Sequence, residues 1–116
     1  MADCLFCKII SGEIPSTEVY SDEHIYAFKD LHPQAPIHHL IVPRVHHDDI
    51  LALQESGDIG VVMEQVMAAV SAIAKQEGIY ERGFRLVNNC REEGGQTVSH
   101  LHFHLLGGKK LDESTI

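Results

Sequence analysis

Three histidines stand at alternate positions near the C-terminus, in the run His100-Leu101-His102-Phe103-His104. On a β-strand alternate side chains point to the same face, so the three imidazoles would share one face and the apolar residues the other. On a helix the same positions would be spread over roughly 200° of arc. The spacing therefore predicts a strand with a core face and an imidazole face.

Three interpretations of this imidazole face follow from the residues. Zinc enzymes commonly use three protein ligands and a water, so the face could hold a metal ion that performs hydrolysis. Alternatively, one neutral imidazole could attack as a nucleophile while its neighbours orient it and manage protons. The third interpretation is a polar sheet face with no chemical task.

Length and charge restrict the remaining possibilities. A chain of 116 residues is long enough for one core, so we expect a single domain over residues 1–116. The net charge of −8 disfavours binding to nucleic acid or to an anionic membrane. There is no long apolar run and no signal-peptide pattern, and the three cysteines form an odd set. We therefore expect a soluble cytoplasmic protein with free thiols.

The periodicity of apolar residues predicts the elements that must position the histidines. The long segment 58–77 has apolar residues at steps of three and four, which is typical of a helix packed on a core. Shorter helices are expected at 4–10, after an N-cap at Asp3, and at 50–54, and strands at 18–20, 24–28, 39–42, 85–87 and 98–106. Most connections are too short for parallel crossovers. The predicted fold class is α+β, a five-stranded antiparallel sheet with one long helix packed on it and short flanking helices.

Several motifs together resemble the histidine triad (HIT) superfamily, and most closely its Hint branch. The triad is followed by Leu105-Leu106-Gly107-Gly108 and preceded by Gly94-Gly95-Gln96-Thr97-Val98, and the run Pro33-Gln34-Ala35-Pro36-Ile37-His38 matches the loop before the third strand. The likeness also includes the segments 6–10, 13–15 and 27–30 and so extends along nearly the whole chain.

The resemblance implies a hydrolase that cleaves the P–N bond of purine nucleoside phosphoramidates and releases AMP and an amine. By the same resemblance, His102 is the nucleophile and forms a covalent nucleotidyl-imidazole that water then hydrolyses. His104, His100 and His38 complete the catalytic set, and no cofactor is needed for catalysis. No Lys or Arg lies between residues 92 and 108, so backbone N–H groups, imidazoles and hydroxyls would have to stabilise the phosphoryl oxygens.

Other positions match substrate-binding residues of the family. Asp30 matches the carboxylate that accepts from the ribose hydroxyls. The polar residues expected around the phosphate are Asn89, Gln96 and Thr97, and the residues expected around the base are Phe6, Ile9, Phe28 and Leu31. Ordinary core packing is the alternative interpretation for the last four. His24, His32, His39 and His47 match no role, and we expect them to be solvated or locally hydrogen-bonded.

A second group of residues could hold a structural metal ion. Cys4 and Cys7 lie one helical turn apart, and a tetrahedral zinc site needs two more ligands. Some bacterial members of the superfamily take these from positions that match His46 and His100 here. The resemblance thus implies a structural zinc bound by Cys4, Cys7, His46 and His100, whereas the alternative is that both cysteines are small buried apolar residues.

The resemblance also implies a homodimer, in which the long helix and the fourth strand pair across a two-fold axis to make one continuous sheet. Two other functions remain open. A dinucleoside polyphosphate hydrolase of the Fhit type lacks the glycine pair after the triad, so Gly107-Gly108 argues against it. The intact triad argues against a non-catalytic nucleotide-binding module.

Overall fold

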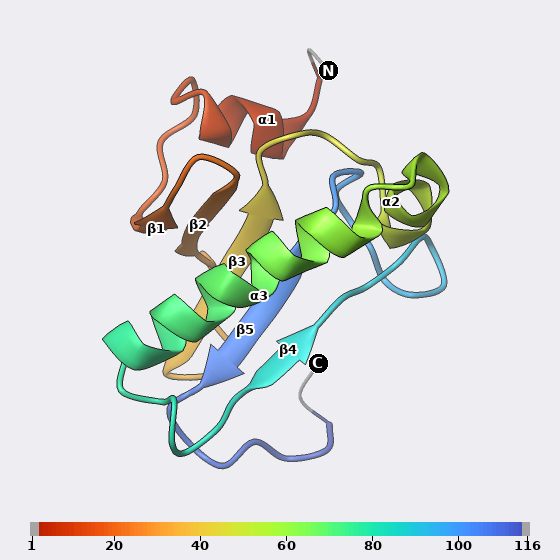
Figure 1. Ribbon diagram of the computed structural model, residues 1–116. Coiled ribbons are helices and arrows are strands. Elements are labelled where there is room, and N and C mark those ends of the chain that lie inside the picture. Colours follow the sequence, from red (N-terminus) through yellow and green to blue (C-terminus); the bar gives the residue numbers. More distant parts are fainter. Residues whose placement is uncertain (1–2, 115–116) are drawn as a thin grey trace.

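A computed structural model of the chain describes residues 3–114 and contains one five-stranded sheet (Figure 1). The elements in chain order are α1 (Leu5–Ile10), β1 (Glu18–Ser21), β2 (Ile25–Lys29), β3 (Ile37–Pro43), α2 (Ile50–Ser56), α3 (Ile59–Gln76), β4 (Arg85–Val87) and β5 (Phe103–Gly107). The strand order is β1-β2-β3-β5-β4, and every neighbouring pair is antiparallel. The predicted fold class is therefore confirmed.

Helix α3 lies across one face of the sheet and covers the main core (Figure 1). Its buried residues are Val66, Ala69, Val70, Ile73 and Ala74, which form the expected stripe. They pack against residues that alternate along the strands, including Ala27, Ile41 and Leu105. No helix within the described part of the chain is long and apolar enough to span a membrane.

Helix α1 packs on the opposite face of the sheet. Phe6 and Ile9 of α1 form a second cluster with the intervening residues of β2 and β3, among them Phe28 and Leu40. Figure 1 shows α1 far from α3, near the end of β3. The histidines of the triad belong to this smaller, α1-covered side of the sheet, because Phe6 packs edge-on against both His100 and His102.

The fifth strand is shorter than predicted. Regular strand begins only at Phe103, and residues 98–102 form an irregular segment. The Leu101 N–H donates to the His47 carbonyl at 2.7 Å, and the His100 N–H donates to the Val98 carbonyl at 2.8 Å, so neither joins a ladder. The expected division of faces nevertheless holds, since Leu101 and Phe103 lie in the α3-side core.

The N-terminal helix also begins differently from the prediction. Cys4, not Asp3, is its N-cap, and the Cys4 Sγ accepts from the Cys7 N–H at 3.2 Å. Asp49 caps α2 through a bond from the Ala52 N–H to Oδ1 at 2.8 Å. His24 lies outside β2 because its N–H donates to Asp22 Oδ1 in the connecting turn.

Candidate active site and metal cluster

Neighbouring strands β3 and β5 bring three histidines together. Leu40 of β3 pairs with His104 of β5, and His38 lies two residues along β3 on the same face. The His38 and His104 ring centroids are 5.2 Å apart, and those of His102 and His104 are 5.4 Å apart. The structure therefore groups three of the four predicted catalytic histidines around one site.

A chain of hydrogen bonds assigns the protons of His38 and His104. The Gln34 backbone N–H donates to His38 Nδ1 at 3.0 Å, so this nitrogen carries no proton. Neutral His38 then has its proton on Nε2, which donates to His104 Nδ1 at 2.9 Å. Because His104 Nδ1 accepts this bond, the neutral His104 ring has its proton on Nε2. The His104 side chain lines a cavity. The two hydrogen bonds therefore leave His104 Nε2–H as a donor.

The proton of His102 is assigned in the same way. Its Nδ1 lies 2.8 Å from the His100 carbonyl oxygen, which can only accept, so Nδ1 carries the proton. The lone pair of the ring is therefore on Nε2. Asn88 Nδ2 donates to the His102 carbonyl at 3.0 Å and fixes the backbone of the same residue. His102 thus has the tautomer that a nucleophile attacking through Nε2 requires.

Burial keeps these imidazoles neutral. It lowers the pKa of His104 to about 4, and the neighbouring His102 and His38 act in the same direction. Burial also lowers the pKa values of His38 and His102, although the Asp30 carboxylate opposes the shift in both cases. The proton assignments above therefore apply at neutral pH.

A cavity of about 300 Å³ opens beside these histidines. Its walls include Phe6, Ile9 and Phe28, which are buried, and Leu31, which is 88% exposed at the rim. Its polar residues include Asp30, Thr97, His102 and His104. An apolar pocket with a few polar groups at one end is the usual form of a small-molecule site. All four residues predicted to contact a base line this cavity, and three also belong to the α1-side core.

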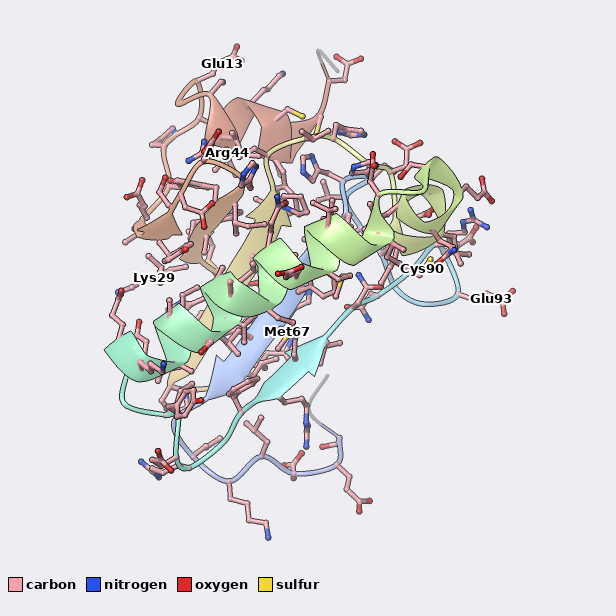
Figure 2. All side chains as sticks on the ribbon, in the orientation of Figure 1. Glu13, Lys29, Arg44, Met67, Cys90 and Glu93 are labelled. Carbon is pink, nitrogen blue, oxygen red and sulfur yellow. The ribbon has the colours of Figure 1, made fainter. Side chains whose placement is uncertain are left out.

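Asp30 is placed at the boundary between the cavity and the histidines. Its Oδ1 accepts from the His32 N–H at 2.8 Å, and its Oδ2 lies 3.5 Å from His38 Nε2. Lys29 is the one Lys or Arg among the described residues that line the cavity. Its exposed side chain projects away from the body of the molecule (Figure 2), so it leaves the polar end of the cavity without a cation.

The loop from Asn88 to Ser99 is held by its own side chains. Asn89 Nδ2 donates to the Gly94 carbonyl, and Gln96 Nε2 donates to the carbonyls of Asp48 and Val98. Neither amide lines the cavity that contains His102, whereas Thr97 does. A Cβ on Gly94 would lie 2.3 Å from the Cys90 carbonyl oxygen, so internal packing of the loop requires this glycine. Cys90 and Glu93 mark this loop in Figure 2.

The fourth predicted catalytic histidine, His100, lies in a cluster of cysteines and histidines. The ligand atoms of Cys4, Cys7, His46 and His100 all lie within 4.8 Å of one another. His100 Nδ1 is 3.3 Å from Cys4 Sγ and 3.6 Å from Cys7 Sγ, and His46 Nδ1 is 3.5 Å from Cys7 Sγ. Ligands of a tetrahedral zinc ion are separated by about 3.6 Å for these bond lengths.

The surroundings of the cluster suit a metal ion as well. His100 Nε2 donates to the Pro43 carbonyl at 2.8 Å, and His46 Nε2 donates to Asp48 Oδ1 at 2.7 Å. Both rings therefore direct an unprotonated Nδ1 toward the sulfur atoms, as metal-bound histidines do. Burial raises the pKa of the Cys7 thiol to about 11, so a cation would have to displace its proton. The four residues fit zinc.

Sequence reasoning missed several residues that support the site. Asn88, which holds the His102 backbone, adjoins the predicted Asn89, and nothing in the sequence distinguishes the two. The Gln34 N–H and the His100 carbonyl are backbone groups and carry no signal in residue type. His39, expected to be solvated or locally bonded, is 4% exposed on the α3 side of β3, where its Nε2 donates to Glu77 Oε1 at 2.9 Å.

Comparison with known proteins gives the family of this chain. Residues 11–111 match the family described as HIT domain. The chain is 45% identical to the purine nucleoside phosphoramidase of Escherichia coli strain K12, over 94% of this chain and 90% of that protein. It is 41% identical to a 14 kDa zinc-binding protein of Brassica juncea, over 95% of this chain and 96% of that protein.

Solved structures agree with this family. The HIT family hydrolase from Legionella pneumophila Philadelphia 1 superposes with a TM-score of 0.89 at 43% identity and covers 97% of this chain and 98% of its own. The chain therefore belongs to the HIT family, and it resembles the Hint-like members, as the sequence motifs indicated. It is a hydrolase.

Proposed function

We propose that this chain hydrolyses purine nucleoside phosphoramidates, releasing AMP and an amine, through a nucleotidyl intermediate on His102. The observation that carries the proposal is the unprotonated Nε2 of His102, fixed by the bond from Nδ1 to the His100 carbonyl beside a cavity of nucleoside size. The name of the Escherichia coli relative supports the same substrate class. The 116 residues would act as a single domain with one such site.

In the first step, His102 Nε2 forms a bond to phosphorus while the P–N bond breaks. The amine leaves with the electron pair of that bond and takes a proton from solvent. The imidazole becomes cationic when it carries the nucleotide, so its Nδ1–H donates a stronger, charge-assisted bond to the His100 carbonyl. Water then attacks phosphorus, loses a proton to solvent and releases AMP, which restores neutral His102.

The other residues of the cavity bind and orient the substrate. His104 Nε2–H donates to a phosphoryl oxygen, and His38 positions His104 by donating to its Nδ1. Thr97 supplies a hydroxyl at the same end, and Asp30 accepts from the ribose hydroxyls. Phe6, Ile9, Phe28 and Leu31 contact the base. Asn89 and Gln96 would act by holding the loop near the phosphate.

A direct test compares wild type with His102→Ala on adenosine phosphoramidate, with release of AMP as the readout. Wild type should produce AMP, and the variant should lose at least about a thousandfold in rate because no other group can form the intermediate. His24→Ala, which removes an exposed histidine outside the cavity, is the matched control and should keep the wild-type rate. Equal rates for wild type and His102→Ala would remove His102 from the mechanism.

We also propose that Cys4, Cys7, His46 and His100 bind a structural zinc ion. The mutual distances and the fixed imidazole protons support this, as does the name of the Brassica juncea relative. With four protein ligands the site leaves no open position for catalysis. The ion would instead hold α1 against the segment before β5. The proposed hydrolysis of phosphoramidates would therefore need no metal ion.

The free thiols suit a reducing compartment, and we place the protein in the cytoplasm.

A third proposal is a homodimer that pairs through α3 and β4. Strand β4 lies at an edge of the sheet, and edge strands are where the sheets of two copies can join. Val61 and Met67 of α3 are 61% and 44% exposed, and Met67 is labelled in Figure 2. A two-fold axis beside β4 would join the sheets and cover these side chains.

A further inference from the structure

A pair of hydroxyl groups lies at the rim of the cavity that contains His102, and the proposed mechanism does not use it. Ser16 lines this cavity and is exposed. Its Oγ lies 2.8 Å from the hydroxyl oxygen of Tyr26, which is 8% exposed and belongs to the α1-side core. A buried tyrosine therefore holds a hydroxyl at the rim of a ligand cavity, where it can contact what the cavity binds.

The order of the strands sets the distance between this pair and the catalytic histidines. His104 lies on β5, and β3 and β2 separate β5 from β1. The Lys29 N–H of β2 donates to the Thr17 carbonyl at 3.0 Å, so residues 16–17 continue the line of β1. Three strand spacings of about 4.8 Å each place Ser16 roughly 14 Å from His104 across the sheet. The cavity thus has imidazoles at one end and hydroxyls at the other.

The residues between the two ends match the parts of a purine nucleotide in order. The proposed function places the phosphate at His102 and His104 and the ribose at Asp30. Phe28 lies on β2, between the histidine-bearing strands and β1, so a base packed on Phe28 occupies the middle of the cavity. The edge of that base opposite the ribose is then directed toward Ser16.

The bond with Tyr26 determines what Ser16 can offer to a ligand. A phenol is a stronger acid than an aliphatic alcohol, so the Tyr26 O–H donates and Ser16 Oγ accepts. Ser16 keeps its own proton and a second lone pair for another partner. The Tyr26 ring is itself held, since it stacks on Phe28 with centroids 5.8 Å apart and the Arg44 guanidinium lies 5.6 Å from its centroid. Ser16 is therefore a positioned hydroxyl that can both donate and accept.

We propose that Ser16, held by Tyr26, hydrogen-bonds the substituent at C6 of the purine base. This substituent is an amino donor in adenine and an oxo acceptor in guanine, so a hydroxyl that donates and accepts suits both. The inference rests on the proposed function and adds to it the part of the base that is recognised. A protein with this contact binds 6-amino and 6-oxo purine nucleotides alike and discriminates against a purine that has only hydrogen at C6.

The test measures binding of three nucleotides to the full chain by isothermal titration calorimetry. They are AMP, IMP, which has an oxo group at C6, and purine riboside 5′-monophosphate, which has hydrogen there. Wild type should bind AMP and IMP with similar Kd, and purine riboside monophosphate about three- to tenfold more weakly, the effect of one neutral hydrogen bond. Ser16→Ala should bind all three alike, at the weaker affinity. Ser11→Ala removes an exposed serine hydroxyl outside the cavity and should keep the wild-type ratios.

Tyr26→Phe tests whether Tyr26 positions Ser16, because it removes the phenol hydroxyl and leaves the ring. Ser16 then loses its fixed orientation, so the discrimination should fall between the values of wild type and Ser16→Ala. The ratio of two affinities is unchanged by a general loss of stability and so reports on the contact itself. Full discrimination in Tyr26→Phe would contradict the positioning role.

Three results would overturn the contact with Ser16. They are equal affinity of wild type for AMP and purine riboside monophosphate, the same discrimination in wild type and Ser16→Ala, and a loss of discrimination in Thr17→Val but not in Ser16→Ala. The proposed function fails separately. If the discrimination holds while His102→Ala keeps its rate on adenosine phosphoramidate, the catalytic proposal is wrong and the base contact stands; if His102→Ala loses its rate and the discrimination is absent, the base contact is wrong.

Discussion

Removing the His38 imidazole tests the proposed positioning of His104. In His38→Ala the bond from His38 Nε2 to His104 Nδ1, at 2.9 Å in the structure, is lost. A buried neutral hydrogen bond contributes about 0.5–1.5 kcal/mol, and losing it in the transition state lowers kcat by up to about tenfold. The Gln34 N–H also loses its acceptor, which costs about 1–3 kcal/mol of stability.

The assay is steady-state hydrolysis of adenosine phosphoramidate together with ¹⁵N NMR of the His104 ring. Wild type should show the proton of His104 on Nε2, and His38→Ala should show a mixture of tautomers with lower kcat. His38→Gln, whose amide can donate to Nδ1, should recover part of the rate.

His39→Ala is the matched control for this prediction. It removes the neighbouring imidazole on the α3 side, and with it the bond to Glu77, so it should lower stability and leave kcat unchanged. The reasoning is refuted if His38→Ala keeps the wild-type kcat, or if its His104 tautomer is unaltered while kcat falls.

Three further predictions concern pH, metal and assembly. Burial lowers the pKa of His104 from 6.5 to about 4, so its contribution to stability is complete above pH 6.5 and is lost as the pH falls toward 4. Urea unfolding should show that the free energy of unfolding falls by up to about 3 kcal/mol over this pH range, and by less in His104→Ala. The same pH dependence in both proteins would contradict the lowered pKa of His104. Elemental analysis should find about one zinc per chain, and chelation should lower Tm by about 10 °C while phosphoramidate hydrolysis at 25 °C continues; metal-free protein of unchanged stability argues against the zinc site. Sedimentation at micromolar concentration should give twice the chain mass, and Met67→Asp should give the single mass; a monomeric wild type contradicts the interface.

Most of the fold follows from patterns that local physics controls. The steps of three and four along 58–77 predict α3 to within one residue at each end, because a stripe of that period can bury its side chains only on a helix. The strands at 85–87 and around 39–42 follow from β-rich runs bounded by loops. Short connections predict antiparallel pairing, whereas the position of β5 between β3 and β4 does not follow from them.

The errors occur where distant groups control the backbone. Residues 98–102 have the alternation of a strand, but the Leu101 N–H bonds to the His47 carbonyl and the His100 ring bonds to the Pro43 carbonyl. Pro43 is the last residue of β3 and His47 lies in the loop that follows, so both partners are far from residues 98–102 in the sequence. The Cys4 cap is a different case, because its Sγ accepts from the Cys7 N–H within the same turn and takes the place expected of the Asp3 carboxylate.

The residue types of the candidate site were predictable, and their protonation was not. The motif identifies His38, His102 and His104, and the structure brings them together with Asp30 and the four apolar residues. Their tautomers depend on the Gln34 N–H and the His100 carbonyl, which any residue type could supply. The hydrogen bond of His39 was not predictable either, because its partner Glu77 is distant in the sequence, at the end of α3.

The most direct test of the proposed chemistry is to trap the intermediate. The enzyme is mixed with adenosine phosphoramidate, quenched in denaturant during turnover and measured by intact-protein and peptide mass spectrometry. A nucleophilic His102 predicts a mass increase of one adenylyl group, located on the peptide that contains His102 and absent from His102→Ala. Turnover with no adduct at any quench time, or an adduct on another residue, would contradict it.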